Sequence, residues 1–181
     1  MYMLSKNMAT INIPKNASKT LEEAVERSYP GDPFGHVFFR GHKRASRVKQ
    51  LVASKHGKQK AYSMTFVALI RDPVERYVSA LNHRWASTHD ISLDQAMDKS
   101  FIAAEDFVFS TQASWLDCDT SQQRLFHFKD IHRVLELIGF HGVASLRNES
   151  VKRWTVSDVE NHPWFDFVRE KYAEDYKIIP H

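Results

Sequence analysis

The stretch from Met64 to Ile70 limits the fold more than any other part of this 181-residue chain. Its residues are apolar apart from Thr65, and polar and apolar side chains do not alternate along it. A strand of this kind is typical of the centre of a parallel sheet, where helices cover both faces. We therefore expect a buried strand over residues 64–70, which ends abruptly at the polar turn Arg71-Asp72-Pro73.

A helix is expected directly after this strand, over Val74–Trp85. Asp72 stands where a helix N-cap belongs and Pro73 stands at the first helical position, which is the arrangement that helix starts favour. The apolar residues that follow recur at helical spacing and would face a core. Arg71 then leaves the strand beside a helix start, and Ser79 lies two turns along the same helix.

A second strand–turn–helix unit opens the chain. We expect a short buried strand over Thr10–Ile13, which Pro14 stops, and a helix with one apolar face over Leu21–Arg27. The loop Lys15–Thr20 places two lysines and two hydroxyl side chains beside the free N–H groups of a helix start, and this combination favours an anion. The alternative is an ordinary helix with Ser18 as its N-cap. The loop has no glycine and no Gly-Lys-Ser/Thr ending, so it is not a Walker A motif.

Strands that alternate with helices predict an α/β fold with a parallel sheet. Further short strands are expected over His36–Phe39 and Arg124–Phe128. In such a sheet a ligand lies outside the carboxyl ends of the strands. Three polar segments fall at those ends, and we expect them to form one site. They are Pro14–Thr20, Gly41–His42 and Arg71–Asp72.

The second half of the chain is predicted to be mostly helical. Helices are expected over Ser92–Lys99, Phe101–Phe109 and Ile131–Ile138, and in a final region from Ser157 to about Tyr176. The final region carries an aromatic stripe, which at this spacing is typical of a core rather than of a base-stacking surface. The packing residues expected there are Trp164, Phe165, Phe167, Val168 and Tyr172.

Length and composition indicate one soluble globular domain over residues 1–181. The net charge of +3 is too small to indicate nucleic-acid binding, and no apolar run is long enough for a signal peptide or a membrane span. The lone Cys118 cannot form an internal disulfide, which favours a reducing compartment and hence the cytoplasm. The stretch Arg40–Lys60 contains no acidic residue, so it is either a solvated basic helix or a surface for an anionic partner.

Two of these stretches resemble the cofactor motifs of sulfotransferases. Ile13–Thr20 is similar to their 5′-phosphosulfate loop, and Phe66–Ala80 is similar to their 3′-phosphate motif. Gly41-His42 lies between them, where glycan 2-O-sulfotransferases of the heparan and uronyl type carry a Gly-His with the catalytic base. Ser145–Arg153 and Tyr172–Tyr176 are similar to further parts of the same group. The resemblance implies a P-loop-like three-layer fold with a central, mostly parallel sheet of four to five strands and a helical C-terminal half.

The resemblance also implies a reaction, in which a sulfuryl group passes from 3′-phosphoadenosine 5′-phosphosulfate (PAPS) to a hydroxyl acceptor and leaves PAP. His42 would be the general base, and Lys15 would neutralise the bridging oxygen of the leaving phosphate. Arg71 and Ser79 would hold the 3′-phosphate. The residues implied to bind the cofactor are Lys15, Asn16, Ala17, Ser18, Lys19, Thr20, Arg71, Ser79, Ser150 and Arg153.

Some features of the reaction stay open at this point. Asn16 and Lys19 depart from the family pattern, which usually has a small hydroxyl residue at the position of Lys19. No metal is expected, because cationic side chains can serve a sulfuryl group and the sequence has no cluster of metal ligands. The basic stretch beside His42 favours an anionic sugar as acceptor, with a small metabolite or a lipid as alternatives. The alternative functions are a P-loop-like nucleotide kinase and a non-catalytic nucleotide- or anion-binding module.

Overall fold

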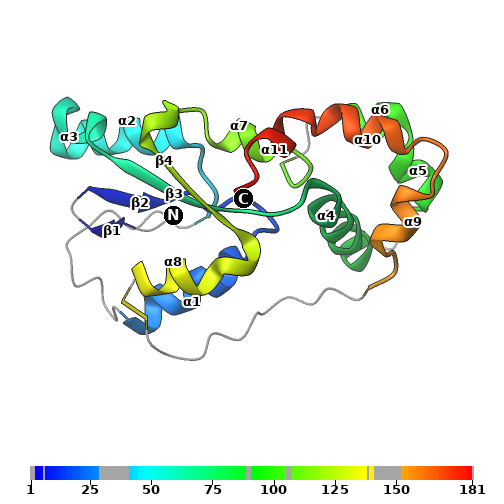
Figure 1. The fold of residues 1–181 in the computed structure, drawn as a ribbon, viewed down its shortest axis with the longest axis horizontal. Helices are drawn as coiled ribbons and strands as arrows, with labels where there is room; N and C mark the ends of the chain where they lie inside the picture. Colours follow the sequence, from blue (N-terminus) through cyan, green and yellow to red (C-terminus); the bar gives the residue numbers. More distant parts are fainter. Residues whose placement is uncertain are drawn as a thin grey trace.

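A computed structural model of the chain describes residues 3–5, 7–28, 41–88, 91–104, 107–137, 139–140 and 152–180 (Figure 1). Its centre is a four-stranded sheet in the order β1-β2-β3-β4. β1 is antiparallel to β2, whereas β2, β3 and β4 run parallel to one another. The α/β class and the parallel sheet predicted from the sequence are thus confirmed. The strands are β1 (Met3–Ser5), β2 (Met8–Thr10), β3 (Thr65–Ile70) and β4 (Gln123–His127).

β3 is the central strand of the sheet, with β2 on one side and β4 on the other. Successive side chains of a strand point to opposite faces. Phe66, Ala68 and Ile70 therefore enter one hydrophobic cluster, while Val67 and Leu69 enter a second. All five side chains are buried, which explains why this strand is apolar throughout.

Helices cover both faces of the sheet (Figure 1). The cluster around Phe66 is closed by α2 (Ala45–His56), α3 (Lys58–Tyr62) and α7 (Gln112–Trp115). The cluster around Val67 is closed by α1 (Ser18–Ser28) and α8 (Ile131–Leu137). The described part of the chain therefore has a layer of helices, a sheet and a second layer of helices.

A further group of helices packs beyond the carboxyl end of β3 (Figure 1). α4 (Pro73–Thr88) begins directly after this strand, and its buried face holds Tyr77 and Leu81. Asp72 caps the helix as predicted, since its Oδ1 accepts from Val74 N–H at 2.9 Å and from Glu75 N–H at 3.0 Å. The helices that share this cluster with α4 are α5 (Leu93–Met97), α6 (Lys99–Ala103), α9 (Val156–Glu160) and α10 (Phe165–Lys171), and α11 (Ala173–Lys177) packs between α10 and α7.

Several predicted boundaries at the two ends of the sheet are shifted. The strand expected over Thr10–Ile13 is β2, over Met8–Thr10, and the ladder continues only to the bond from Ile11 N–H to the Val67 carbonyl at 2.8 Å. After that bond the chain leaves the sheet and enters the loop that begins at Pro14. The strand expected over Arg124–Phe128 begins and ends one residue earlier, as β4. The strand predicted over His36–Phe39 lies outside the described residues.

Some predicted helices are shorter than expected. The helix predicted over Phe101–Phe109 is α6, which ends at Ala103, and residues 107–109 form a turn. The final helical region is divided into α9, α10 and α11, and Pro163 lies in the break after α9, where its ring cannot continue a helix. Trp164 was expected to pack in the core and is 45% exposed, so that prediction is wrong, whereas Tyr172 is buried as predicted.

In the parts of the chain that the structure describes, no helix combines the length and the apolar character that a membrane span requires.

Candidate functional site

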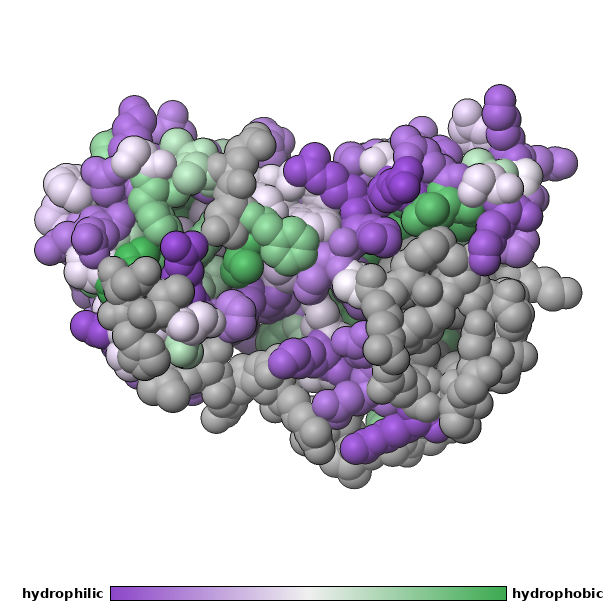
Figure 2. Space-filling view, turned by 180° about the vertical axis from the view of Figure 1, so that it is seen from behind, coloured by the Kyte–Doolittle hydropathy of each residue, from purple (hydrophilic) through white to green (hydrophobic). Residues whose placement is uncertain are grey.

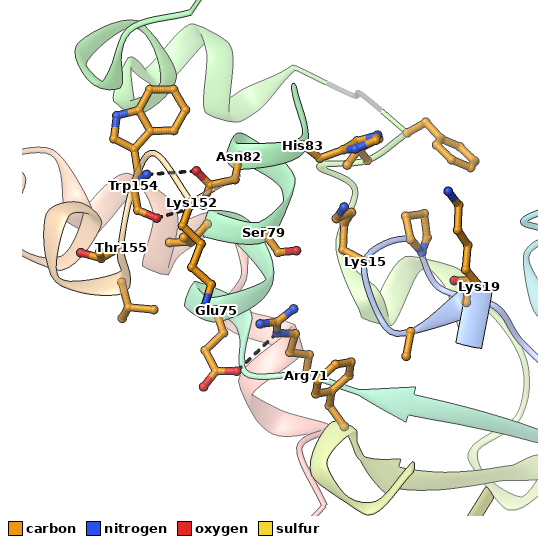
Figure 3. A pocket seen from close by; sticks show the side chains of 18 of the residues that line it. Lys15, Lys19, Arg71, Glu75, Ser79, Asn82, His83, Lys152, Trp154 and Thr155 are labelled. Atoms are coloured by element: carbon orange, nitrogen blue, oxygen red, sulfur yellow. Dashed lines mark hydrogen bonds and ion pairs between the residues drawn. The ribbon is translucent and has the colours of Figure 1, made fainter. Parts of the chain in front are cut away.

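A pocket of about 760 Å³ lies at the carboxyl ends of β2 and β3 (Figure 3). The loop after β2, the end of β3 and the first three turns of α4 form much of its wall. On the face shown in Figure 2, hydrophilic side chains border a hollow between the two halves of the molecule. Seven of the residues proposed from the sequence line this one pocket, namely Lys15, Ala17, Ser18, Lys19, His42, Arg71 and Ser79.

The backbone of the loop after β2 has an unusual conformation. Lys15 has a φ of 68° and Ala17 a φ of 58°, so both lie in the left-handed region that non-glycine residues rarely adopt. Such residues cost about 1–3 kcal/mol each and occur where the surrounding structure holds them, often at ligand sites. Ser18 does not act as a conventional N-cap, because its hydroxyl donates to the Ile13 carbonyl at 2.9 Å. Ser18 and Lys19, in the first turn of α1, line the pocket.

Two residues of the predicted cofactor loop turn away from the pocket. The buried amide of Asn16 donates to the Leu69 carbonyl at 2.7 Å and to Gln112 Oε1 at 2.6 Å. Thr20 is also buried, and its hydroxyl has no hydrogen-bond partner among the described residues. The side chains of Asn16 and Thr20 are thus placed behind the loop, while Lys15 is in the pocket wall.

The pocket carries an excess of positive charge. Its cations are Lys15, Lys19, Arg71 and Lys152, and among the described residues that line it only Glu75 is acidic. Burial, followed by the charges of Arg71 and Lys19, lowers the pKa of Lys15 to about 8. Burial is the largest cause of this depression, and the repulsion by Arg71 and Lys19 adds to it; a bound anion would relieve that repulsion.

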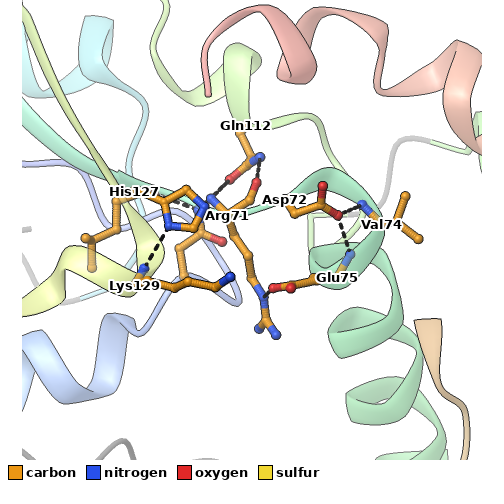
Figure 4. Close-up of polar contacts among 9 residues, drawn as sticks. Arg71, Asp72, Val74, Glu75, Gln112, His127 and Lys129 are labelled. Carbon is orange, nitrogen blue, oxygen red and sulfur yellow. Dashed lines mark hydrogen bonds and ion pairs between the residues drawn. The ribbon is translucent and has the colours of Figure 1, made fainter. Parts of the chain in front are cut away.

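Arg71 is held at the end of β3 by two neighbours, and Figure 4 shows the first of them, Glu75. The Nε of Arg71 lies 3.3 Å from the Glu75 carboxylate, and its guanidinium group lies 4.7 Å from the centre of the Phe128 ring. Ser79 lines the pocket one turn after Glu75 on α4. A fixed, planar guanidinium beside a hydroxyl is well suited to a phosphate group.

Arg76 supports the loop from beneath and was missed in the sequence. It is almost completely buried; its Nε donates to the Pro14 carbonyl and one of its terminal nitrogens donates to the Val108 carbonyl, both at 3.1 Å. Burial lowers its pKa, and the charge of Asp175 partly opposes that shift. The sequence held no clear signal for this role, because the helix face of Arg76 also carries the polar residues Ser79 and His83.

His42 lies at the pocket in the segment before α2. Its Nδ1 is 2.5 Å from the Asn12 carbonyl oxygen. A carbonyl can only accept, so Nδ1 carries the hydrogen, and in the neutral ring Nε2 keeps a free lone pair. The ring stands edge-on to Phe107, with 5.1 Å between the ring centres. Burial lowers the pKa of His42, while the hydrogen bond to Asn12 opposes part of this shift, so the ring is neutral at pH 7 and Nε2 can accept a proton.

The wall opposite the loop is formed by the segment from Lys152 to Val156, which the sequence reasoning largely missed. Asn82 on α4 fixes this segment (Figure 3): its Nδ2 donates to the Trp154 carbonyl at 2.9 Å, and its Oδ1 accepts from the backbone N–H groups of Arg153 and Trp154. Asn82 is buried on α4, and this burial is seen only in the structure.

Arg153, one of the two covering residues predicted in the C-terminal half, does not line the pocket. The Arg153 guanidinium lies over the rings of Trp85 and Trp154, at 4.8 and 5.2 Å from their centres. Ser150 lies outside the described residues. Within the described ranges, no group of three or more His, Cys, Asp or Glu side chains is arranged to hold a metal ion.

Comparison with known proteins gives one match. A family model with the description Sulfotransferase family matches residues 4–138 of the chain. Searches of curated proteins and of solved structures give no significant match. The matched range includes the loop after β2, His42, Arg71 and Ser79, and it ends before the wall segment around Trp154.

Proposed function

The chain belongs to the sulfotransferase family, and on that basis we propose that it transfers a sulfuryl group from PAPS to a hydroxyl group of an acceptor. One observation carries the proposal: Lys15, Arg71 and His42 line the same pocket although they lie far apart in the sequence. The pocket therefore combines two cationic groups for a doubly phosphorylated nucleotide with a neutral imidazole for the acceptor.

The residues present fit this cofactor. PAPS has one anionic group at each end of its ribose, and when bound it would supply the activated sulfuryl group. The excess of cations in the pocket favours a polyanion. We propose that Lys15, Ser18 and Lys19 hold the 5′-phosphosulfate and that Arg71 and Ser79 hold the 3′-phosphate, in a P-loop-like arrangement at the carboxyl ends of the parallel strands.

Two side chains would act directly on the reaction. His42 Nε2 would take the proton of the acceptor hydroxyl, because Nδ1 is already committed to the Asn12 carbonyl. The Lys15 ammonium would neutralise the charge that develops on the departing phosphate oxygen. Transfers of this kind pass through a loose, in-line transition state, so positioning and charge stabilisation by these groups account for most of the expected catalysis.

The acceptor is proposed to be an anionic sugar. The described residues from Lys43 to Lys60 follow His42 directly and include no acidic residue, and Arg44 and Arg47 are exposed. Phe107 is 51% exposed beside His42, and an exposed ring of this kind suits the apolar face of a sugar. The cations would attract the acidic groups of the acceptor while His42 receives one of its hydroxyls.

A comparison of nucleotides by thermal shift tests the proposed function. We expect 3′,5′-ADP to raise the melting temperature far more than 5′-ADP, since Arg71 and Ser79 would bind the 3′-phosphate. At a concentration one hundred times its dissociation constant, a ligand stabilises the folded state by about 2.7 kcal/mol. Equal shifts with 3′,5′-ADP and with ATP plus Mg²⁺ would contradict the proposal and favour a kinase, and no shift with any nucleotide would also contradict it.

The depressed pKa of Lys15 predicts a pH dependence of nucleotide binding. The protonated ammonium binds an anion and the neutral amine does not, so affinity for 3′,5′-ADP should be highest below pH 8 and fall as the pH rises through about 8. The phosphates are already fully ionised there, because their second pKa is near 6. Calorimetric titration at pH 8 in two buffers with different ionisation enthalpies should show proton uptake on binding. The uptake should disappear in Lys15→Met, and its persistence in that variant would assign it to another group.

A further inference from the structure

We propose that Gln112 is a positioning residue that fixes the distance between the two anion-binding ends of the pocket. The inference rests on the proposed function, because it concerns a ligand that is held at both ends. Gln112 is fully buried and does not line the pocket, so it would act through the residues that do.

Gln112 is bonded to the segments that follow both β2 and β3, and Figure 4 shows its two bonds to Arg71, which follows β3. The Oε1 of Gln112 accepts from Arg71 N–H at 2.9 Å and from Asn16 Nδ2 at 2.6 Å, and its Nε2 donates to the Arg71 carbonyl at 2.8 Å. The backbone of Arg71 fixes the orientation of the amide, because its N–H requires an acceptor and its carbonyl requires a donor. The Asn16 amide must then donate to the same oxygen.

These bonds connect two segments that the sheet itself no longer holds together. The last backbone bond between the two strands in the described residues runs from Ile11 N–H to the Val67 carbonyl, four residues before Arg71. Beyond it, Asn16 reaches across to the Leu69 carbonyl and to Gln112. The side-chain amides thus continue the link up to the residues that line the pocket, Lys15 beside Asn16 and Arg71 itself.

The position of Gln112 is itself determined from the C-terminal end of the chain. The Asp175 carboxylate on α11 accepts from Gln112 N–H at 2.8 Å and from Ala113 N–H at 2.9 Å. Asp175 is fully buried, so these bonds are sheltered from water. A rigid connection therefore extends from α11 through Gln112 to both ends of the site, and it begins outside the range that the family model matches.

A fixed distance has a measurable consequence for a ligand with two anionic groups. When both sites are spaced correctly, binding of the first phosphate holds the second at a high effective concentration. When the spacing varies, each phosphate can still bind alone, but the two no longer bind together as well. Loss of Gln112 should therefore reduce the cooperation between the two phosphates rather than the affinity for either one.

A cycle of four ligands measures this cooperation in wild type and in Gln112→Met. The dissociation constants of adenosine, 5′-AMP, 3′-AMP and 3′,5′-ADP are determined by competitive calorimetry. In wild type the two phosphates together should improve affinity by at least the product of their separate effects. Gln112→Met keeps the side-chain length. In this variant we expect the combined effect of the two phosphates on affinity to fall about tenfold below the product of their separate effects, while the affinity for each monophosphate changes by less than about threefold.

Gln122→Met is a matched control for the loss of a buried glutamine. Gln122 also makes three side-chain bonds: it donates to the carbonyls of Tyr62 and Met64 and accepts from Lys49 Nζ. It precedes β4, at the opposite end of the sheet from the pocket, so its loss should affect stability without changing the cycle. The same fall in Gln112→Met and in Gln122→Met would overturn the inference.

Asn16→Ala gives a second, milder test in case Gln112→Met does not fold. It breaks the link from the loop to Gln112 while Arg71 stays bound to Gln112, so the combined effect should fall by about threefold. An unchanged cycle in Asn16→Ala, or an equal loss for all four ligands in Gln112→Met, would overturn the role of Gln112. If wild type itself binds 3′,5′-ADP no better than 5′-AMP, the proposed function fails. The outcomes that overturn only the role of Gln112 are seen in the variants, so the two failures can be told apart.

Discussion

His42→Ala is expected to lower kcat by about 10²–10⁴ while the affinity for 3′,5′-ADP stays close to that of wild type. The reason is geometric: His42 Nδ1 donates to the Asn12 carbonyl, so Nε2 is the free acceptor in the pocket. The cations that favour the nucleotide come from other elements and are not changed. Single-turnover assays with saturating PAPS, together with calorimetry, separate the loss of transfer from any loss of binding.

The pH profile provides an independent readout for this residue. Only neutral His42 can accept a proton, so kcat/KM should be lost as the pH falls through the pKa of the free enzyme. Burial holds that pKa below the ordinary value of 6.5, so the acid limb should lie below pH 6.5 in wild type and be absent in His42→Ala.

Two other histidines serve as controls for His42. His132 is exposed on α8 and does not line the pocket, so His132→Ala should keep wild-type kcat. His83 does line the pocket, on α4, and its pKa is lowered by partial burial and by the charges of Lys15 and Lys19. A large loss in His83→Ala combined with normal turnover in His42→Ala would assign the role of base to His83.

Arg76→Met is expected to reduce the free energy of unfolding by about 2–4 kcal/mol. The substitution removes the bond that Arg76 donates to the buried Pro14 carbonyl and the bond that it donates to the part-buried Val108 carbonyl. It also removes the positive charge whose field reaches the buried carboxylate of Asp175. Urea denaturation followed by circular dichroism measures the change, and nucleotide affinity should fall as well because the Pro14 loop loses its support.

Arg169→Met is the matched control for this loss. Arg169 is an exposed arginine on α10 whose partner, Asp166, is also exposed, with 3.7 Å between the charged groups. Surface pairs of this kind contribute about 0.2–1 kcal/mol, so this variant should stay close to wild type. A loss of less than about 1 kcal/mol in Arg76→Met would show that other groups replace its bonds to the loop.

The sequence predicted the residues whose signals are local. Asp72 and Pro73 predicted the start of α4, and in the structure Asp72 accepts hydrogen bonds from two N–H groups of the first turn. The uninterrupted apolar run predicted that β3 is covered on both faces. These patterns act over a few residues, where hydrogen bonding and the alternation of side chains leave little choice.

The predictions were weakest where a side chain could turn in either direction. Asn16 was expected to face the cofactor, and its amide is instead buried against Leu69 and Gln112. Arg153 was expected to close over the nucleotide, and it stacks on Trp85 instead. Nothing in the neighbouring residues decides such a choice, because the partner that satisfies each polar group comes from a distant segment.

The sequence by itself determined the central strand, the polar loops at the carboxyl ends of the strands and the cationic and imidazole side chains within those loops. Only the tertiary structure decided how these loops are held in place, through bonds between residues that lie 62 positions apart for Arg76 and Pro14, 72 for Asn82 and Trp154 and 96 for Asn16 and Gln112. The physical reason is that a buried polar group must find a partner, and which partner it finds depends on how the layers pack.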